Sequence, residues 1–530
     1  MSHCIPRPLC LEFGDEVPSV VRARMSYAFR VFAAIYGHAV IEAKHDRSSG
    51  SLNCFYGAGG GNAGARRIAP RYVPRRPEGP APKPQAATYA KQEFHLFHGR
   101  DQVSGNPDWL GEIFEWLSAA HEMSVEARDA IGRIPYAQTV FGSYGISPLR
   151  PHASLMMAWF ENFIRGGPQL EKQAEKVVED LPAAPSPLPA ACHLVIASHD
   201  IDFYFAGRWG SLVRVVKNLG IAVLLARSFA FFKDNAGQLL QLARGRRVGD
   251  YLGELLRRSR EDGFSSTFFI LAEHQHRRDG NYRLEQMVQR LREIPAAGSA
   301  LALHGSYRSI VENSDLAAEV ETLAASTGER PRGSRQHWLR FDHPAKLFSN
   351  IEKAGLQYDS SWGWAEQLGF RHGAAFAFPP YNFAAEAPYN FLLIPLVIMD
   401  RGLQVAHDRS AEAPAKLAEG VLAESRRWGW GGVSVLWHNP VEPLSACREV
   451  NEIFWQLVKA KERHQERWLS AEKFMELSLS RYQQAGLLQE MGTKPAAGLP
   501  HEWASGGNAQ RFEFDAQPDG IPAVQSQICN

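Results

Sequence analysis

Two carboxylates follow a short apolar run near the middle of the chain. In "IASHDIDFYF" (196–205), Asp200 and Asp202 come just after Leu194 and Val195. Successive residues of a strand point to opposite faces. Asp200 and Asp202 are two residues apart, so both carboxylates share one face if the strand continues through them. One can then hold a metal ion while the other removes a proton from water. Alternatively, either acid only caps the helix predicted to follow, where acids are favoured.

Histidines and acids recur just beyond other apolar runs. The four clusters are "SHDID" (198–202), "LALHGSY" (301–307), "SRQHWLRF" (334–341) and "SVLWHNP" (434–440). Imidazole and carboxylate together are typical ligands of a catalytic Zn²⁺ site. The six cysteines show no CxxC pair, which excludes a cysteine-rich zinc module and a disulfide framework. Taken one at a time, a histidine at a strand end is more often an ordinary hydrogen-bonded surface or core residue than a ligand.

The elements that position these clusters alternate between two patterns. Short apolar runs occupy 194–197, 266–271, 300–303, 392–398 and 433–437, and helical periodicity occupies 211–218, 283–292, 316–325, 344–354 and 414–427. This alternation predicts an α/β fold of repeated βα units around a mainly parallel sheet or barrel. In such folds the site forms at the carboxyl ends of the strands, where the clusters lie.

Composition shifts divide the chain into segments. We expect a mixed α+β N-terminal accessory domain at 1–180, with a flexible Gly/Pro/Arg-rich insertion at 57–85. A proline-rich linker at 181–191 leads to a catalytic domain at 192–480. The last segment, 481–530, loses its periodicity and is expected to be a partly disordered extension.

The overall charge and hydrophobicity exclude several classes of protein. Lys and Arg total 58 against 57 Asp and Glu, so charge gives no indication of a nucleic-acid partner. No run approaches eighteen apolar residues and no signal-peptide pattern is present, which predicts no membrane span and a cytoplasmic location. The oligomeric state is left open.

The ordered motifs of residues 192–475 resemble those of the polysaccharide deacetylase family, of the NodB-homology or carbohydrate esterase family 4 type. The resemblance is to the branch with an additional N-terminal domain. The motifs that carry it are "SHDID", "SSTFFIL" (265–271), "LALHGSY", "RQHWLRF", "YDSSWGW" (358–364), "QLGFRHGAAFAFPPYN" (367–382), "LLIPLVIMDRGL" (392–403) and "SVLWHNP". The resemblance implies a distorted (β/α) barrel and one divalent metal, zinc first, with cobalt or nickel as alternatives.

The resemblance also implies a division of roles. Asp200 would be the general base, oriented by Arg335, and Asp202 and His304 would be metal ligands. His438 would be the general acid that protonates the leaving amine. The reaction would remove an N-acetyl group from a carbohydrate and release acetate and a free amino sugar.

Further residues receive supporting roles. The resemblance implies that Asp359 steadies the histidine acid and that Trp362 or Trp364 forms an apolar wall. We also expect Tyr307 and Arg371 to contact the substrate.

One position departs from the family pattern. The usual motif is His-x-x-x-His, but Arg308 stands four residues after His304, and a cation cannot bind a metal. We expect His337, in the unusual "RQHW" motif, to complete an Asp/His/His set. Otherwise the metal is held weakly or catalysis is lost. His199, beside the acids, is expected to point to the opposite face and to be structural.

Two other functions remain open at this stage. One is a non-catalytic carbohydrate-binding protein with a degenerate site, and the other is a hydrolase of the same fold that acts on a non-sugar amide. The position of His337 relative to the other ligands discriminates between catalysis and binding alone.

Overall fold

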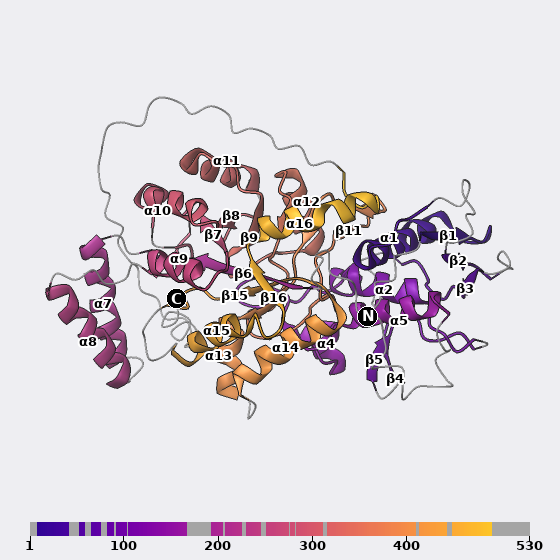
Figure 1. The fold of residues 1–530 in the computed structure, drawn as a ribbon, viewed down its shortest axis with the longest axis horizontal. Coiled ribbons are helices and arrows are strands. Elements are labelled where there is room, and N and C mark those ends of the chain that lie inside the picture. The colour runs from indigo at the N-terminus through magenta and orange to yellow at the C-terminus, as the bar shows by residue number, and fades with distance from the viewer. Residues whose placement is uncertain are drawn as a thin grey trace.

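A parallel sheet covered by helices forms the larger part of the protein (Figure 1). The computed structural model describes residues 8–41, 52–58, 65–75, 82–89, 92–102, 104–166, 192–204, 207–224, 229–244, 251–274, 276–280, 282–310, 315–409, 413–441 and 448–489. Strands and helices alternate from residue 193 onward, which confirms the predicted α/β class.

The strands are β1 (Leu9–Phe13), β2 (Leu52–Tyr56), β3 (Arg66–Ile68), β4 (Gln85–Tyr89), β5 (Gln92–Leu96), β6 (His193–Ile201), β7 (Thr267–Leu271), β8 (Ala300–Gly305), β9 (Gly333–Gln336), β10 (Tyr358–Asp359), β11 (Tyr381–Asn382), β12 (Ala387–Pro388), β13 (Leu392–Leu393), β14 (Leu396–Met399), β15 (Gly431–Leu436) and β16 (Glu466–Leu469). The helices are α1 (Ser19–Tyr36), α2 (Trp109–Leu117), α3 (Ala120–Met123), α4 (Val140–Tyr144), α5 (His152–Ile164), α7 (Gly207–Leu224), α8 (Phe229–Ala243), α9 (Tyr251–Glu261), α10 (Leu284–Ala296), α11 (Leu316–Thr327), α12 (Pro344–Lys353), α13 (Asp400–Arg409), α14 (Pro414–Trp428), α15 (Arg448–Ala460) and α16 (Ala471–Gln484).

The order of strands in the large sheet is β13-β10-β9-β8-β7-β6-β15-β14, and β16 also pairs with β6. All of these pairings are parallel. Strand β7 is buried at all five positions, as expected for a continuous apolar strand covered on both faces. In Figure 1, α10, α11 and α12 lie on one side of the sheet and α13, α14 and α15 on the other.

The two edges of this sheet come from one short segment. Strand β13 pairs with β10 at one end of the order, and β14 pairs with β15 at the other. Only Ile394 and Pro395 separate the two strands along the chain. The sheet therefore curls back on itself until its two edges are neighbours in sequence.

The register of the strands aligns the chemically capable residues. His304 on β8 is paired with Leu271 on β7 and with Arg335 on β9. Asp200 lies near the end of β6, opposite Phe269. Parallel strands end at the same edge of a sheet, so these side chains meet there.

The N-terminal part contains a parallel sheet β1-β2-β3, a hairpin of β4 and β5, and the helices α1 to α5. Residues 57–85 were expected to be a flexible insertion, yet β3 lies inside that range and pairs with β2. Backbone pairing with β2, rather than an apolar period, holds this strand in place, and the sequence pattern therefore did not reveal it. The expected linker at 181–191 lies outside the described residues, so the domain boundary stays a prediction.

Buried contacts join the N-terminal part to the large sheet. The Arg371 guanidinium, 3% exposed, donates bidentate hydrogen bonds to Glu122, which is fully buried. Arg24 on α1 pairs with Glu386 at 2.6 Å. One hydrophobic core contains side chains from both parts. In the described part of the chain, no helix combines the length and apolarity needed to cross a bilayer.

Candidate active site and metal centre

A buried arginine fixes the first carboxylate of the Asp-x-Asp pair. Arg335 is fully buried, and its Nη1 donates a hydrogen bond to Asp200 Oδ1 at 2.7 Å. Its remaining donors contact the carbonyl and hydroxyl oxygens of Ser360 and the hydroxyl of Ser434. The guanidinium also stacks over Phe269, 4.2 Å from the ring centroid. Hydrogen bonds and ring stacking therefore fix the position of the guanidinium. The guanidinium in turn orients the Asp200 carboxylate.

His304 turns one nitrogen towards the second carboxylate. Its Nδ1 lies 2.9 Å from the carbonyl oxygen of Arg335, which can only accept a hydrogen bond. The proton is therefore on Nδ1, and the lone pair of Nε2 is free to act as a ligand. Nε2 lies 3.2 Å from Asp202 Oδ1.

His337, directly after β9, also turns its Nε2 towards the Asp202 carboxylate and its Nδ1 away from it. Its Nδ1 is 3.5 Å from Asp279 Oδ1, and its Nε2 is 3.6 Å from Asp202 Oδ2. Burial by itself lowers the pKa of His337, but the carboxylates of Asp202 and Asp279 raise it to about 9. Burial by itself raises the pKa of Asp202, but His337 and His304 hold it well below its usual value.

The residues present fit a divalent metal ion. One ligand atom each from Asp202, His304 and His337 lies within 4.8 Å of the others, and all three residues are buried. Asp202 Oδ1 is buried and has no hydrogen-bond partner among the described residues, which is costly unless a cation satisfies it. Two imidazoles and one carboxylate are a donor set typical of zinc. Arg308, which replaces the second motif histidine, has an exposed side chain instead.

The turn that carries Asp279 packs directly on the backbone of Asp202. A side chain at Gly280 would collide with the carbonyl oxygen of Asp202, so only glycine permits this approach. Tyr282 then donates a hydrogen bond to the Ile201 carbonyl at 2.8 Å. Asp279 was not expected from the sequence, although the Asp-Gly pair in "RRDGN" is a turn signal.

The backbone just after His337 adopts an unusual conformation. Trp338 and Leu339 have φ values of 63° and 51°, in the left-handed region that non-glycine residues avoid. The Trp338 indole donates a hydrogen bond to the Arg278 carbonyl at 3.3 Å. Such strain is concentrated at functional sites, and here it ends β9 so that His337 turns towards Asp202.

His438 lies on the other side of the Asp202 carboxylate. Its Nε2 is 3.8 Å from Asp202 Oδ2, and its Nδ1 is 2.9 Å from Asp400 Oδ1. Asp400 also accepts the backbone N–H of His438 at 2.8 Å. Burial by itself lowers the pKa of His438, but the nearby carboxylates, first that of Asp400, raise it to about 10.

The expectation that Asp359 steadies His438 is wrong. His438 is paired with Asp400, which directly follows β14, the neighbour of β15, whereas Asp359 ends β10. The Asp359 carboxylate instead accepts hydrogen bonds from Ser334 and Ser361. Burial raises its pKa to about 6. Asp400 was missed, although "LVIMDRGL" places an acid directly after a strand.

The four residues expected to contact substrate lie elsewhere. Arg371 is bound to Glu122, and Trp362 is 1% exposed and stacked on Phe341. Trp364, 5% exposed, packs edge-on against ring side chains of the N-terminal part. The ring of Tyr307 is stacked on a histidine, while its backbone N–H donates a hydrogen bond to Asp279 at 2.8 Å. Arg371, Trp362 and Trp364 are buried, and none of the four residues lines the pocket beside the acids.

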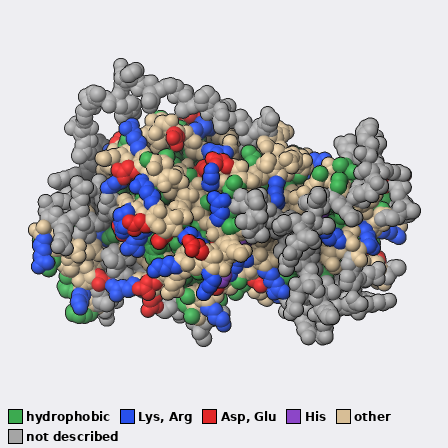
Figure 2. Space-filling model, in the orientation of Figure 1, with side chains coloured by type: hydrophobic (Ala, Val, Ile, Leu, Met, Phe, Trp, Pro, Cys, Tyr) green, Lys and Arg blue, Asp and Glu red, His purple; other side chains and the backbone are tan. Residues whose placement is uncertain are grey.

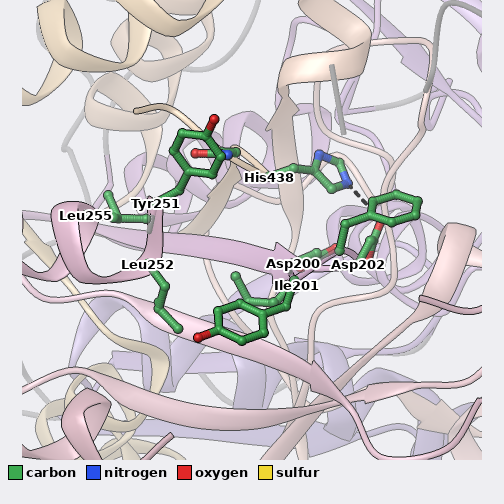
Figure 3. Close-up of a pocket in the computed structure, with 10 residues that line it drawn as sticks. Asp200, Ile201, Asp202, Tyr251, Leu252, Leu255 and His438 are labelled. Atoms are coloured by element: carbon green, nitrogen blue, oxygen red, sulfur yellow. Dashed lines mark ion pairs between the residues drawn. The ribbon is translucent and has the colours of Figure 1, made fainter. Parts of the chain in front are cut away.

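An open pocket lies beside the acids (Figure 3). Its lining consists of Asp200, Ile201, Asp202, Phe203, Tyr204, Tyr251, Leu252, Leu255, His438 and Asn439. In Figure 3 the imidazole of His438 points to the Asp202 carboxylate, while side chains of α9 form an apolar wall. Small-molecule sites commonly combine apolar walls with a few polar groups in this way.

His199 lies away from this pocket, as expected. Its Nδ1 contacts the Trp437 carbonyl at 2.7 Å and its Nε2 contacts the Ser266 hydroxyl at 3.2 Å. Both nitrogens are used inside the core, which is a structural role.

Asp400→Asn is expected to lower kcat by about 10- to 100-fold, as loss of an orienting carboxylate commonly does. The amide no longer raises the pKa of His438, so His438 should lose its proton at a lower pH than in the wild type. Activity should therefore begin to fall at that lower pH. A kcat–pH profile of hydrolysis measures both effects. Asp342→Asn, a partly exposed acid outside the pocket, is the control. An unchanged profile in Asp400→Asn would remove Asp400 from the site.

Neither the protein-family models nor the curated proteins contain a match to this chain. The solved structures that are similar to it include the following two. One is the peptidoglycan deacetylase PdaC from Bacillus subtilis in a mutant form, with a TM-score of 0.25, 9% identity, and coverage of 56% of this chain and 95% of that one. The other is a mutant of BA3943, described as a CE4 family pseudoenzyme, with a TM-score of 0.27, 10% identity, and coverage of 60% and 83%.

Proposed function

We propose that this protein is a metal-dependent hydrolase that removes N-acetyl groups from a carbohydrate. The observation that carries the proposal is the convergence of three imidazole Nε2 atoms, at 3.2, 3.6 and 3.8 Å, on the two oxygens of the Asp202 carboxylate. Asp200 lies beside this cluster and forms an ion pair with Arg335. The ordered motifs that resemble those of polysaccharide deacetylases support the same reaction.

The side chains divide the proton transfers between two sides of the pocket. Asp200 accepts a proton from the attacking water, and Arg335 keeps its carboxylate oriented for that transfer. His438 is positively charged at neutral pH because its pKa is raised, so it has a proton to give to the leaving nitrogen. The C–N bond then breaks to release acetate and the amine.

Asp202, His304 and His337 would hold the metal ion. When bound, such an ion supplies a Lewis acid that polarises the acetyl carbonyl and makes water more acidic. Zinc is our first choice for a carboxylate and two imidazoles, with cobalt or nickel as alternatives.

Asp200→Asn tests the proposal because it separates metal binding from chemistry. Acetate release from N-acetylglucosamine oligomers is expected to fall by about 10²- to 10⁴-fold, the usual contribution of a general base. The zinc content of the purified variant should equal that of the wild type, because Asp200 is not among the proposed ligands.

The wild-type protein with and without chelator is the reference for this test. Loss of acetate release on chelation, with recovery on added zinc, supports the hydrolase. If the wild type with zinc binds the oligomers but releases no acetate, the protein is a carbohydrate-binding protein instead. If it releases acetate only from a small non-sugar amide, the substrate class is wrong.

A further inference from the structure

The helices α7 and α8 form a hairpin that stands apart from the rest of the protein. In Figure 1 they lie at one end of the molecule, beyond α9 and away from the sheet. They pack mainly on each other, and Arg214 of α7 donates a hydrogen bond to Gln238 of α8 at 2.6 Å. Each of the two helices packs one face against the other helix and leaves its opposite face outward.

The outward side of each helix carries exposed apolar side chains. The exposed side chains and their exposed fractions are Val213 (49%), Val216 (54%), Val223 (57%), Leu224 (76%), Phe229 (80%), Phe232 (38%) and Leu240 (51%). In the other described ranges, the large apolar side chains of comparable exposure are Val73, Tyr144 and Phe203. A concentration of this kind in one hairpin marks an interaction surface rather than ordinary scatter.

The spacing gathers these side chains into one stripe on each helix. Val213, Val216 and Val223 recur at helical intervals, and a side chain added at Gly220 would meet no atom within 4 Å. Phe229, Phe232 and Leu240 recur in the same way on α8. We call these two stripes together the hairpin face.

Basic residues flank the hairpin face. Lys217 lies beside the stripe of α7 and Lys233 beside that of α8, and both side chains are exposed. Residues 207–244 contain six Lys or Arg and a single acid, Asp234, although the whole chain is almost neutral. Asp234 lies 3.8 Å from Arg448 of α15. In Figure 2 this end of the molecule shows Lys and Arg side chains next to hydrophobic ones.

We propose that the hairpin face docks on the surface of a lipid bilayer that contains anionic lipids. Apolar side chains flanked by lysines are the pattern of helices that lie in the membrane interface without crossing it. The apolar stripe would enter the boundary between headgroups and acyl chains, and Lys217 and Lys233 would contact anionic headgroups. The proposal does not depend on the hydrolase activity.

Charge argues against a second copy of the chain as the occupant. Two hairpin faces packed together would bring Lys217 and Lys233 of one copy near those of the other, and the one acid of the hairpin, Asp234, is paired with Arg448. Like charges brought together at an apolar interface oppose association. An anionic lipid surface has the complementary charge.

The hairpin connects directly to the pocket. It leaves the sheet just after Tyr204 and returns at Tyr251, and both residues line the pocket. The guanidinium of Arg214 stacks over the Tyr251 ring, 5.0 Å from its centroid. Docking of the hairpin face would therefore hold the pocket close to the membrane surface.

Flotation of the full-length protein with vesicles tests the proposal. We expect binding to vesicles of phosphatidylcholine and phosphatidylglycerol, weaker binding to phosphatidylcholine alone, and release at high salt because salt screens surface charge. The double variant Lys217→Ala/Lys233→Ala should bind about thirtyfold more weakly, since each lysine near an anionic surface contributes about fivefold. Leu224→Ser/Phe229→Ser should bind at least about tenfold more weakly, because less apolar area is buried.

Two matched variants control for general effects of the same substitutions. Val73→Ser removes an exposed apolar side chain from the N-terminal part, and Lys459→Ala removes an exposed cation from α15. Both should bind vesicles as the wild type does. The proposal is overturned if the wild type does not float, or if the hairpin variants float equally well. It is also overturned if the wild type self-associates through the hairpin face without binding vesicles.

Discussion

His337→Ala is expected to lower the affinity for zinc by more than about 100-fold, because even the loss of a residue that only orients a ligand costs 10- to 100-fold. His337 supplies one of only three proposed ligands, and Arg308 is exposed where the family pattern has a second histidine. Zinc competition with a chromophoric chelator measures the affinity, and acetate release should fall with it.

His464→Ala is the matched control for this substitution, because His464 pairs with Glu419 outside the pocket. Asp279→Asn provides an intermediate case, with an expected loss of about 10- to 100-fold in zinc affinity. Zinc bound as tightly by His337→Ala as by the wild type would show that His337 is not a ligand.

Glu122→Ala is expected to lower the free energy of unfolding by about 3–5 kcal/mol, the usual cost of leaving a buried charge without its partner. Glu122 is fully buried, and its partner Arg371 also donates to the Gly363 carbonyl at 2.7 Å. The guanidinium lies 4.8 Å from the centre of the Trp362 ring, so water cannot replace the lost carboxylate easily. Urea denaturation followed by tryptophan fluorescence measures the change.

Glu126→Ala, an exposed acid close in sequence, should change stability by less than about 0.5 kcal/mol. The double variant Glu122→Leu/Arg371→Met should recover much of the loss, because it leaves no unpaired buried charge. If Glu122→Ala is as stable as Glu126→Ala, the contact between α3 and the sheet is not needed for stability.

Apolar periodicity predicted the elements of the large sheet well. Runs at 194–197, 266–271 and 300–303 fall in β6, β7 and β8, because a strand covered on both faces must be continuously apolar. The run at 392–398 was taken as one element, whereas the chain forms two strands there at opposite edges of the sheet. Hydrophobicity indicates which residues are buried, but it does not indicate which strands pair with each other.

The same limit explains which site residues the sequence could give. Asp202, His304 and His337 were named from the family resemblance and from their positions at strand ends, and β6, β8 and β9 of one parallel sheet bring them together. The partner of His438 depends on the order of the strands, so Asp359 was named in place of Asp400. Arg371 was assigned to substrate because a sequence does not show that Glu122, 249 residues away, is its partner.

The site is assembled from two parts of the chain, one before and one after the segment that joins the two edges of the sheet. Residues from β6 to β9, with the turns after them, bring Asp200, Asp202, His304 and His337 together through neighbouring strands. Asp400 and His438 arrive only with β14 and β15, and β15 pairs with β6 although the two strands lie far apart along the chain. Contacts between distant parts of a chain form late in folding. A folding intermediate with an open sheet would therefore hold metal before it could perform hydrolysis.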